Sequence, residues 1–162
     1  NIAVEAALTG HLVLSTLHTN DSVNTVTRLV NMGIPNYLVS SSVSLVIAQR
    51  LARKNCESCK TKDTDIKTHT LEQLGIKEKI TVYKGKGCSK CNNTGFKGRR
   101  GIYEILKITP KIQDAILKNK TAPEIMEIAK SEGYRPMQEV GADYLKSGDL
   151  AFEEFQRTLF VG

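Results

Sequence analysis

Four cysteines in two Cys-x-x-Cys pairs constrain the fold of this chain more than any other feature. Cys56 and Cys59 form the first pair, Cys88 and Cys91 form the second, and positions 60 to 87 separate the pairs by 28 residues. Each pair can bend around one ion, and two pairs complete a closed tetrahedral shell of four thiolates. We therefore predict a structural zinc site, which leaves no open position for catalysis.

Disulfides and free buried thiols are the alternative interpretations of these cysteines. The opening residues Asn-Ile-Ala-Val-Glu have no signal-like pattern, which favours a reducing compartment, where disulfides are rare. A thioredoxin-like redox site needs one pair beside a βαβ unit, whereas this chain has two distant pairs. Structural zinc is the better expectation.

Basic residues gather in the segment that holds the cysteines. The net charge is +6, but residues 50–107 alone contain 15 Lys and Arg against 6 Asp and Glu. Four thiolates around Zn²⁺ gain from cationic neighbours. A basic module that grips nucleic acid is the rival interpretation, yet few aromatic residues interleave with the basic ones and no later helix resembles a groove reader. We therefore expect no nucleic acid partner.

A second pattern is an apolar run flanked by histidines. Residues 12–17 are uncharged, of strand length, and alternate too little for a half-exposed sheet face, so we predict a strand buried on both faces. His11 precedes this run and His18 follows it. Ligands of open α/β sheets bind where strands end and helices begin, so we expect His18, Thr19 and Asn20 at the mouth of a site. The alternative is that these histidines are only surface or capping residues.

The remaining periodicities predict an α/β chain. Two strands, residues 47–53 and 102–108, are expected to pair and to bring the cysteine pairs together. Between them we expect a short helix at residues 70–74 and a strand at residues 80–83. Further helices are expected at residues 2–8 and 21–32, and after the capping or starting residues Asn36, Thr109, Thr121, Pro136 and Asp149.

Several segments together resemble the GspE/PilB-like secretion ATPases, the family that drives type II secretion and type IV pilus assembly. The run Thr-Gly-His-Leu-Val-Leu-Ser-Thr-Leu-His-Thr-Asn-Asp, residues 9–21, resembles the family's His box. The four cysteines match members with a zinc-binding insertion, and residues 95–104 resemble the Gly-aromatic-Lys-Gly-Arg and Glu segment that follows it. These segments occur in the family's order over nearly the whole chain.

The resemblance implies three structural parts. Residues 1–53 would be the C-terminal part of a RecA-like P-loop ATPase core, and residues 54–108 a tetracysteine zinc-binding subdomain with a returning strand. Residues 109–162 would form a C-terminal helical bundle. The full-length parent would bind ATP and Mg²⁺, form a homo-hexamer and work with inner-membrane platform proteins. It would be cytoplasmic and peripheral to the inner membrane, and the chain itself has no apolar run of transmembrane length.

The resemblance also implies roles for particular residues. His18 would sense or polarise the γ-phosphate of ATP, and His11 would help to position that element. Thr19, Asn20 and Arg50 would lie near the nucleotide. The Walker A phosphate loop, Gly-x-x-x-x-Gly-Lys-Ser/Thr, does not occur in these 162 residues, and the acidic Walker B motif would end just before them. We therefore expect no hydrolysis by the chain alone. The alternative function is a non-catalytic zinc-containing adaptor that binds nucleic acid or protein.

Overall fold

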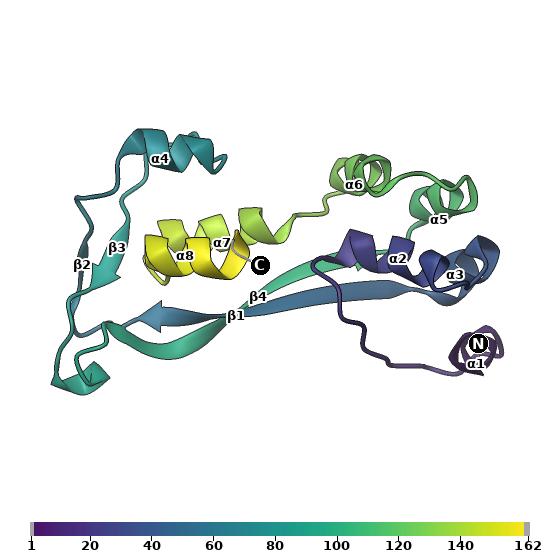
Figure 1. Cartoon of the computed structure of the whole chain (residues 1–162), viewed down its shortest axis with the longest axis horizontal. Helices are drawn as coiled ribbons and strands as arrows, with labels where there is room; N and C mark the ends of the chain where they lie inside the picture. The colour runs from purple at the N-terminus through teal and green to yellow at the C-terminus, as the bar shows by residue number, and fades with distance from the viewer. Residues whose placement is uncertain (1, 161–162) are drawn as a thin grey trace. The chain divides into compact units, whose positions relative to one another are not determined.

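The computed structural model describes residues 2–160 and has a mixed α/β fold, as expected (Figure 1). The first and last residues of the expected parts 1–53 and 109–162 lie outside the described residues. In chain order the elements are α1 (Ile2–Leu8), α2 (Ser22–Asn31), α3 (Asn36–Ser42), β1 (Leu45–Asn55), β2 (Lys60–Lys62), α4 (Thr68–Gln73), β3 (Tyr83–Gly85), the 3-10 helix η1 (Ser89–Cys91), β4 (Phe96–Lys107), α5 (Pro110–Leu117), α6 (Ala122–Ser131), α7 (Met137–Lys146) and α8 (Phe152–Leu159).

The chain folds into two compact units. Unit 1 consists of Asn1–Ala48 and Glu104–Arg135, and unit 2 consists of Gln49–Tyr103 and Pro136–Gly162. The chain therefore runs twice through each unit, because β1 and β4 contribute residues to both. The three-part division expected from the sequence follows chain order instead, and it stays a prediction about domains.

β1 and β4 form a two-stranded sheet, which confirms the pairing predicted for residues 47–53 and 102–108. The strands are antiparallel, because the Ile108 N–H donates to the Ser44 carbonyl and the Cys56 N–H to the Gly95 carbonyl. Both strands are longer than predicted, and β4 already begins at Phe96. The glycine-rich, basic run before residue 102 thus continues the ladder rather than forming a loop.

Unit 1 has one apolar core, to which α2, α3, α5, α6 and the adjoining ends of β1 and β4 contribute (Figure 1). Three of its helices begin as predicted. Asp21 caps α2 by accepting from the Asn24 N–H at 2.7 Å, and the Thr109 hydroxyl accepts from the first turn of α5. α6 begins with a capping box of Thr121 and Glu124. The core consists of Val23, Val26, Val39, Val46, Leu106, Ile108, Ile112, Ala115, Ile116, Ile125, Ala129 and Tyr134.

Unit 2 has a second core, formed where α4 and the chain before β3 pack against α7 and α8. Its buried residues are Leu71, Ile76, Val82, Leu145, Phe152 and Phe155. The antiparallel pair β2–β3 lies beside this core, with Thr61 opposite Lys84. The aromatic stripe of the last helix is therefore core, as the spacing predicted.

Three local predictions in these elements are wrong. The strand expected at residues 80–83 instead begins at Tyr83, where β2 supplies its partner. Asn36 is the first residue of α3 rather than its cap, which is Pro35. Asp149 does not cap α8, which begins after Ala151. The Asp149 carboxylate lies instead 3.5 Å from the Arg100 guanidinium, so ion pairing has replaced helix capping.

The buried strand predicted for residues 12–17 is also wrong. The backbone of residues 11–19 has no strand or helix pairing, and Leu12 and Leu14 are 88% and 86% exposed. A strand needs a neighbour to accept its ladder of hydrogen bonds. Within residues 2–160 the strands pair only as β1 with β4 and β2 with β3, so this run has no edge beside it.

Candidate metal centre and histidine segment

The four cysteine sulfurs converge on one point in unit 2. All four lie within 4.8 Å of one another, and three of their separations are 3.8, 3.9 and 3.7 Å (Cys56 to Cys88, Cys59 to Cys91, Cys88 to Cys91). Four sulfurs placed about 2.3 Å from a central zinc in a tetrahedron would be about 3.8 Å apart. The cysteines are free thiols at a spacing that suits a metal ion, so the predicted four-cysteine cluster is confirmed.

Backbone N–H groups point at two of the sulfurs. The Cys91 sulfur accepts from the N–H groups of Cys88 and Gly95 at 3.2 and 3.3 Å, and the Cys59 sulfur accepts from Gly87 at 3.3 Å. Burial raises the pKa of the Cys59 thiol to about 11. Burial also raises the pKa of Cys91, but the two N–H donors outweigh it and lower the pKa to about 6. Such N–H donation stabilises thiolates, the form that binds metals.

Two glycines allow the cysteine pairs to meet. A Cβ atom on Gly85 would overlap the carbonyl oxygen of Gly95, which comes from the loop after the second pair. The same Gly95 carbonyl accepts from the Cys56 N–H at 2.9 Å, and the Lys86 N–H donates to the Cys59 carbonyl at 3.1 Å. The two loops thus close around the sulfurs through direct backbone contact, for which a side chain at Gly85 leaves no space.

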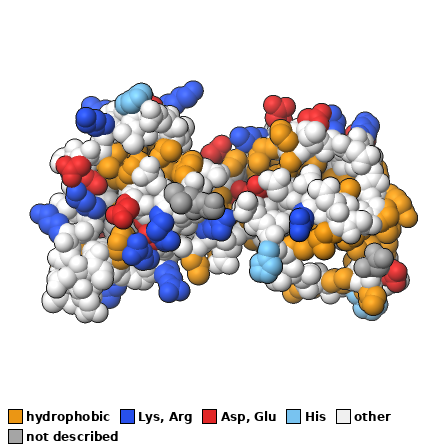
Figure 2. All heavy atoms as spheres, viewed as in Figure 1, with side chains coloured by type: hydrophobic (Ala, Val, Ile, Leu, Met, Phe, Trp, Pro, Cys, Tyr) orange, Lys and Arg blue, Asp and Glu red, His pale blue; other side chains and the backbone are white. Residues whose placement is uncertain are grey.

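The surroundings of the cysteine cluster are basic. Figure 2 shows Lys and Arg side chains gathered over the elements of unit 2, in agreement with the charge of residues 50–107. Two of these cations are fixed on aromatic rings: the Arg53 guanidinium lies 4.1 Å from the Phe96 ring centroid, and that of Arg100 lies 4.2 Å from that of Tyr144. The cluster therefore sits in a lobe whose fixed charges favour a net-negative thiolate site.

The predicted nucleotide residues lie on an extended segment of unit 1. We call residues 11–20 the histidine segment. His18 and Asn20 are exposed and Thr19 is half-buried. The His11 ring nitrogen Nδ1 lies 3.1 Å from the Thr9 hydroxyl and 3.3 Å from the Ala6 carbonyl, so His11 is tied to the end of α1. Arg50 is half-buried on β1. Their roles at a nucleotide stay predictions.

The end of the histidine segment is joined to α2 by hydrogen bonds. The Thr19 hydroxyl lies 2.5 Å from the Thr25 hydroxyl and 3.3 Å from the Asp21 carbonyl. The Asp21 carboxylate caps α2 and also accepts from the Asn24 amide at 2.6 Å. The residues that follow His18 therefore share the position of the helix N-terminus.

A buried polar cluster below this N-terminus was not predicted. The Glu104 carboxylate accepts from both the backbone N–H and the hydroxyl of Ser22, at 2.7 and 2.6 Å. The Tyr134 hydroxyl lies 3.0 Å from the Ser22 hydroxyl. The only sequence signal was an acidic residue at an inward position of a strand, between the buried Ile102 and Leu106.

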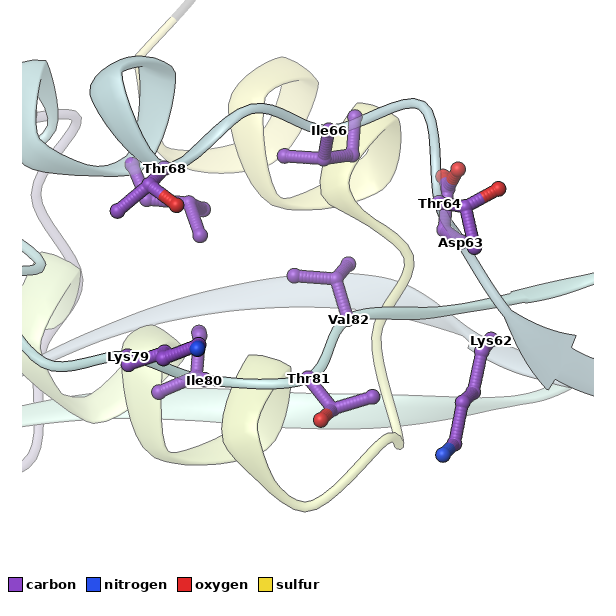
Figure 3. A pocket seen from close by; sticks show the side chains of 10 residues that line it. Lys62, Asp63, Thr64, Ile66, Thr68, Lys79, Ile80, Thr81 and Val82 are labelled. Carbon is purple, nitrogen blue, oxygen red and sulfur yellow. The ribbon is translucent and has the colours of Figure 1, made fainter.

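The cavities of the two units are too small to hold a nucleotide. The one beside α4 has a volume of about 170 Å³ (Figure 3). Val82 points across it toward the segment that carries Ile66, whereas Lys62 points away. A second, of about 200 Å³, lies in unit 1 beside α2. Small-molecule sites usually measure about 300–1,000 Å³, so neither cavity suits ATP.

Comparison with known protein families gives one match over nearly the whole chain. The family described as "Type II/IV secretion system protein" matches residues 1–157. Within residues 2–160 the longest helices have ten residues, about half of what a membrane-spanning helix needs.

Curated relatives are similar at about 40% identity. The type IV pilus assembly ATPase PilB of Pseudomonas aeruginosa is 44% identical over 160 residues, which cover 96% of this chain and 28% of that protein. The type II secretion system ATPase E of Vibrio cholerae is 40% identical over 157 residues, which cover 96% of this chain and 31% of that protein. The chain therefore spans less than a third of the length of these relatives.

One solved structure shares the fold. The Legionella pneumophila ATPase DotB matches with a TM-score of 0.56 and 19% sequence identity, over 94% of this chain and 33% of that one. At this identity the likeness concerns the fold alone.

Proposed function

The chain belongs to the type II/IV secretion system protein family, and we propose that it is the C-terminal part of an ATPase that powers type IV pilus assembly or type II secretion. The observation that carries this proposal is the family match over residues 1–157, together with 44% identity to a named pilus assembly ATPase. The α/β fold shared with the DotB ATPase supports it.

The ATP site of the full-length protein would need more than these residues. A phosphate-binding loop and an acidic residue for Mg²⁺ hold the nucleotide in P-loop ATPases. The Walker A pattern is not in this sequence, and the described cavities are small. We propose that ATP and Mg²⁺ bind to the full-length protein and that the chain alone does not hydrolyse ATP.

Within that site, His18 would act on the γ-phosphate. Its imidazole is exposed three residues before the capping residue of α2, where it can donate a hydrogen bond to a phosphate oxygen. His11 would hold the start of the segment through its contacts at the end of α1. Thr19, Asn20 and Arg50 would lie near the nucleotide.

The four cysteines would hold one structural zinc ion. When bound, zinc would supply a rigid crosslink between the loops that carry Cys56, Cys59, Cys88 and Cys91. Four thiolates close its shell, so the site is proposed as structural. The alternative of a zinc-containing adaptor for nucleic acid or protein is less well supported, because the named relatives are ATPases.

The proposed assembly and location follow from the family. We propose a homo-hexamer that docks on inner-membrane platform proteins from the cytoplasmic side. The apolar side chains of Leu12 and Leu14, exposed in unit 1, are consistent with a segment that pairs with further chain in the full-length protein.

An ATPase assay with the full-length protein tests the proposal. We expect Mg²⁺-dependent hydrolysis by the full-length protein and none by residues 1–162 alone. Full-length protein without hydrolysis, combined with salt-dependent binding of duplex DNA, would replace the proposal with the adaptor function.

A further inference from the structure

Glu104 occupies a position where the strand pattern calls for an apolar residue. It lies on the inward face of β4 between Ile102 and Leu106, and only 2% of its surface is exposed. Burying a carboxylate is costly unless charged or hydrogen-bonding groups compensate for the lost water. The Ser22 N–H and hydroxyl both donate to its oxygen Oε1. This carboxylate is thus paired with the first residue of α2.

Tyr134 completes the buried cluster from the end of α6. The single hydrogen of the Ser22 hydroxyl is directed at Glu104, so the Tyr134 hydroxyl is the donor in its 3.0 Å contact with Ser22. Burial, and then the Glu104 carboxylate, raise the pKa of Tyr134 far above its ordinary value, so the phenol stays a neutral donor. Ser22 is therefore held from two sides.

The fixed Ser22 sets the position of the histidine segment's end. Only three residues separate Ser22 from His18. Two of them are tied to the same helix end: Asp21 caps α2 through Asn24, and the Thr19 hydroxyl contacts that of Thr25. A carboxylate at a helix N-terminus also complements the partial positive charge there. If Ser22 moved, Thr19, Asp21 and the His18 backbone would move with it.

We propose that Glu104 is a positioning residue for ATP hydrolysis: through Ser22 it holds the N-terminus of α2, and thereby His18, in the orientation that meets the γ-phosphate. This inference rests on the proposed function of the full-length protein. Glu104 does not touch the nucleotide in this mechanism. Its effect is on the placement of an imidazole, and misplacement by about 1 Å can slow an enzyme by about 100-fold.

Steady-state kinetics of the full-length protein test the proposal. Glu104→Ala should lower kcat for ATP by at least about 10-fold and change KM by less than about threefold, because other groups bind the nucleotide. Glu104→Gln should recover most of kcat, since its amide oxygen can accept both Ser22 hydrogen bonds. The matched control is Glu124→Ala: Glu124 accepts from the N–H and hydroxyl of Thr121 at 2.8 Å each at the start of α6, and its loss should leave kcat unchanged.

Amide hydrogen exchange gives a second readout that does not depend on turnover. In Glu104→Ala, the amides of residues 19–25 should exchange at least about 10-fold faster, whereas Glu124→Ala should speed exchange only at the start of α6. If Glu104→Ala does not fold, Ser22→Ala serves instead. It keeps the backbone donor but removes the link to Tyr134, and kcat should fall by about twofold to fivefold.

The outcomes separate this inference from the proposed function. Wild-type protein without ATPase activity would refute the proposed function, while exchange would still decide whether Glu104 fixes the α2 N-terminus. An active protein in which His18→Ala is slow but Glu104→Ala has wild-type kcat and exchange would overturn the positioning role. Glu104→Gln as slow as Glu104→Ala would also overturn it, because hydrogen-bond geometry would then not be the cause.

Discussion

The Arg53 guanidinium donates to the carboxylate of Glu154 at 2.8 Å, and the Glu154 side chain is fully buried, with 0% of its surface exposed. The Arg157 guanidinium lies 2.6 Å from the second oxygen, and the Arg53 backbone N–H donates to it at 2.8 Å. Arg53 also covers the Phe96 ring. Through these contacts a single carboxylate joins α8 to β1 and β4 within unit 2.

This arrangement predicts an acid-sensitive contribution to stability. Burial by itself raises the pKa of Glu154, but the hydrogen bonds from Arg157 and Arg53 outweigh it and lower the pKa from 4.5 to about 2. A group whose folded-state pKa is lowered stabilises the fold above its ordinary pKa and loses that effect as the pH falls. The contribution of Glu154 is therefore complete above about pH 4.5 and disappears towards about pH 2.

Glu154→Gln should lower the free energy of unfolding at neutral pH by about 2–3 kcal/mol, because two arginines lose their charged partner. The deficit should shrink as the pH falls below about 4.5. Urea denaturation of wild type and variant in the same buffers measures both effects. Glu153→Gln, a change at the exposed neighbour, is the control and should be close to neutral. Equal stability of Glu154→Gln and wild type at neutral pH would contradict the prediction.

Gly85→Ala should loosen the cysteine cluster. The added methyl would overlap the Gly95 carbonyl, a backbone atom that can move only by separating the two loops. Overpacking of this kind costs about 1–3 kcal/mol, and here we expect it to weaken metal retention. The measurement is the rate of zinc transfer to a chelator, which should rise at least about 10-fold over wild type. Lys86→Ala, in the same loop and exposed, should release zinc at the wild-type rate.

The metal itself is tested by elemental analysis. Purified full-length protein should carry one zinc ion for each set of Cys56, Cys59, Cys88 and Cys91, and this zinc should survive dialysis because structural zinc sites bind tightly. Cys56→Ser combined with Cys91→Ser should leave none and should lower the melting temperature of unit 2. A wild-type protein with two disulfides by mass and no metal would refute the zinc proposal.

Features set by local spacing could be predicted from the sequence. Cys56 and Cys59 are three residues apart, so their shared role needs no tertiary knowledge, and the caps Asp21 and Thr109 act within their own helices. The alternation in residues 102–108 was sufficient to predict the strand and its partner. What the sequence did not show were contacts made by distant residues.

The errors have physical causes of that kind. Glu104 and Ser22 are 82 residues apart, and nothing local to either marks the contact. Asp149 has the composition of a helix cap but pairs with Lys54 and Arg100, which come from other strands. Residues 12–17 have the composition of a buried strand, but burial depends on neighbouring strands, and within residues 2–160 no strand lies beside them.

The turnover of His18→Ala in the full-length protein tests the central claim most directly. Removing a group that interacts with the γ-phosphate should lower kcat by about 100-fold or more, with KM for ATP within about threefold of wild type. The matched control is His69→Ala, because His69 is also exposed and lies on α4, away from the histidine segment in sequence. The account predicts a large loss for His18→Ala and none for His69→Ala. If the two variants hydrolyse ATP equally fast, the histidine segment is not part of an ATP site and the account is contradicted.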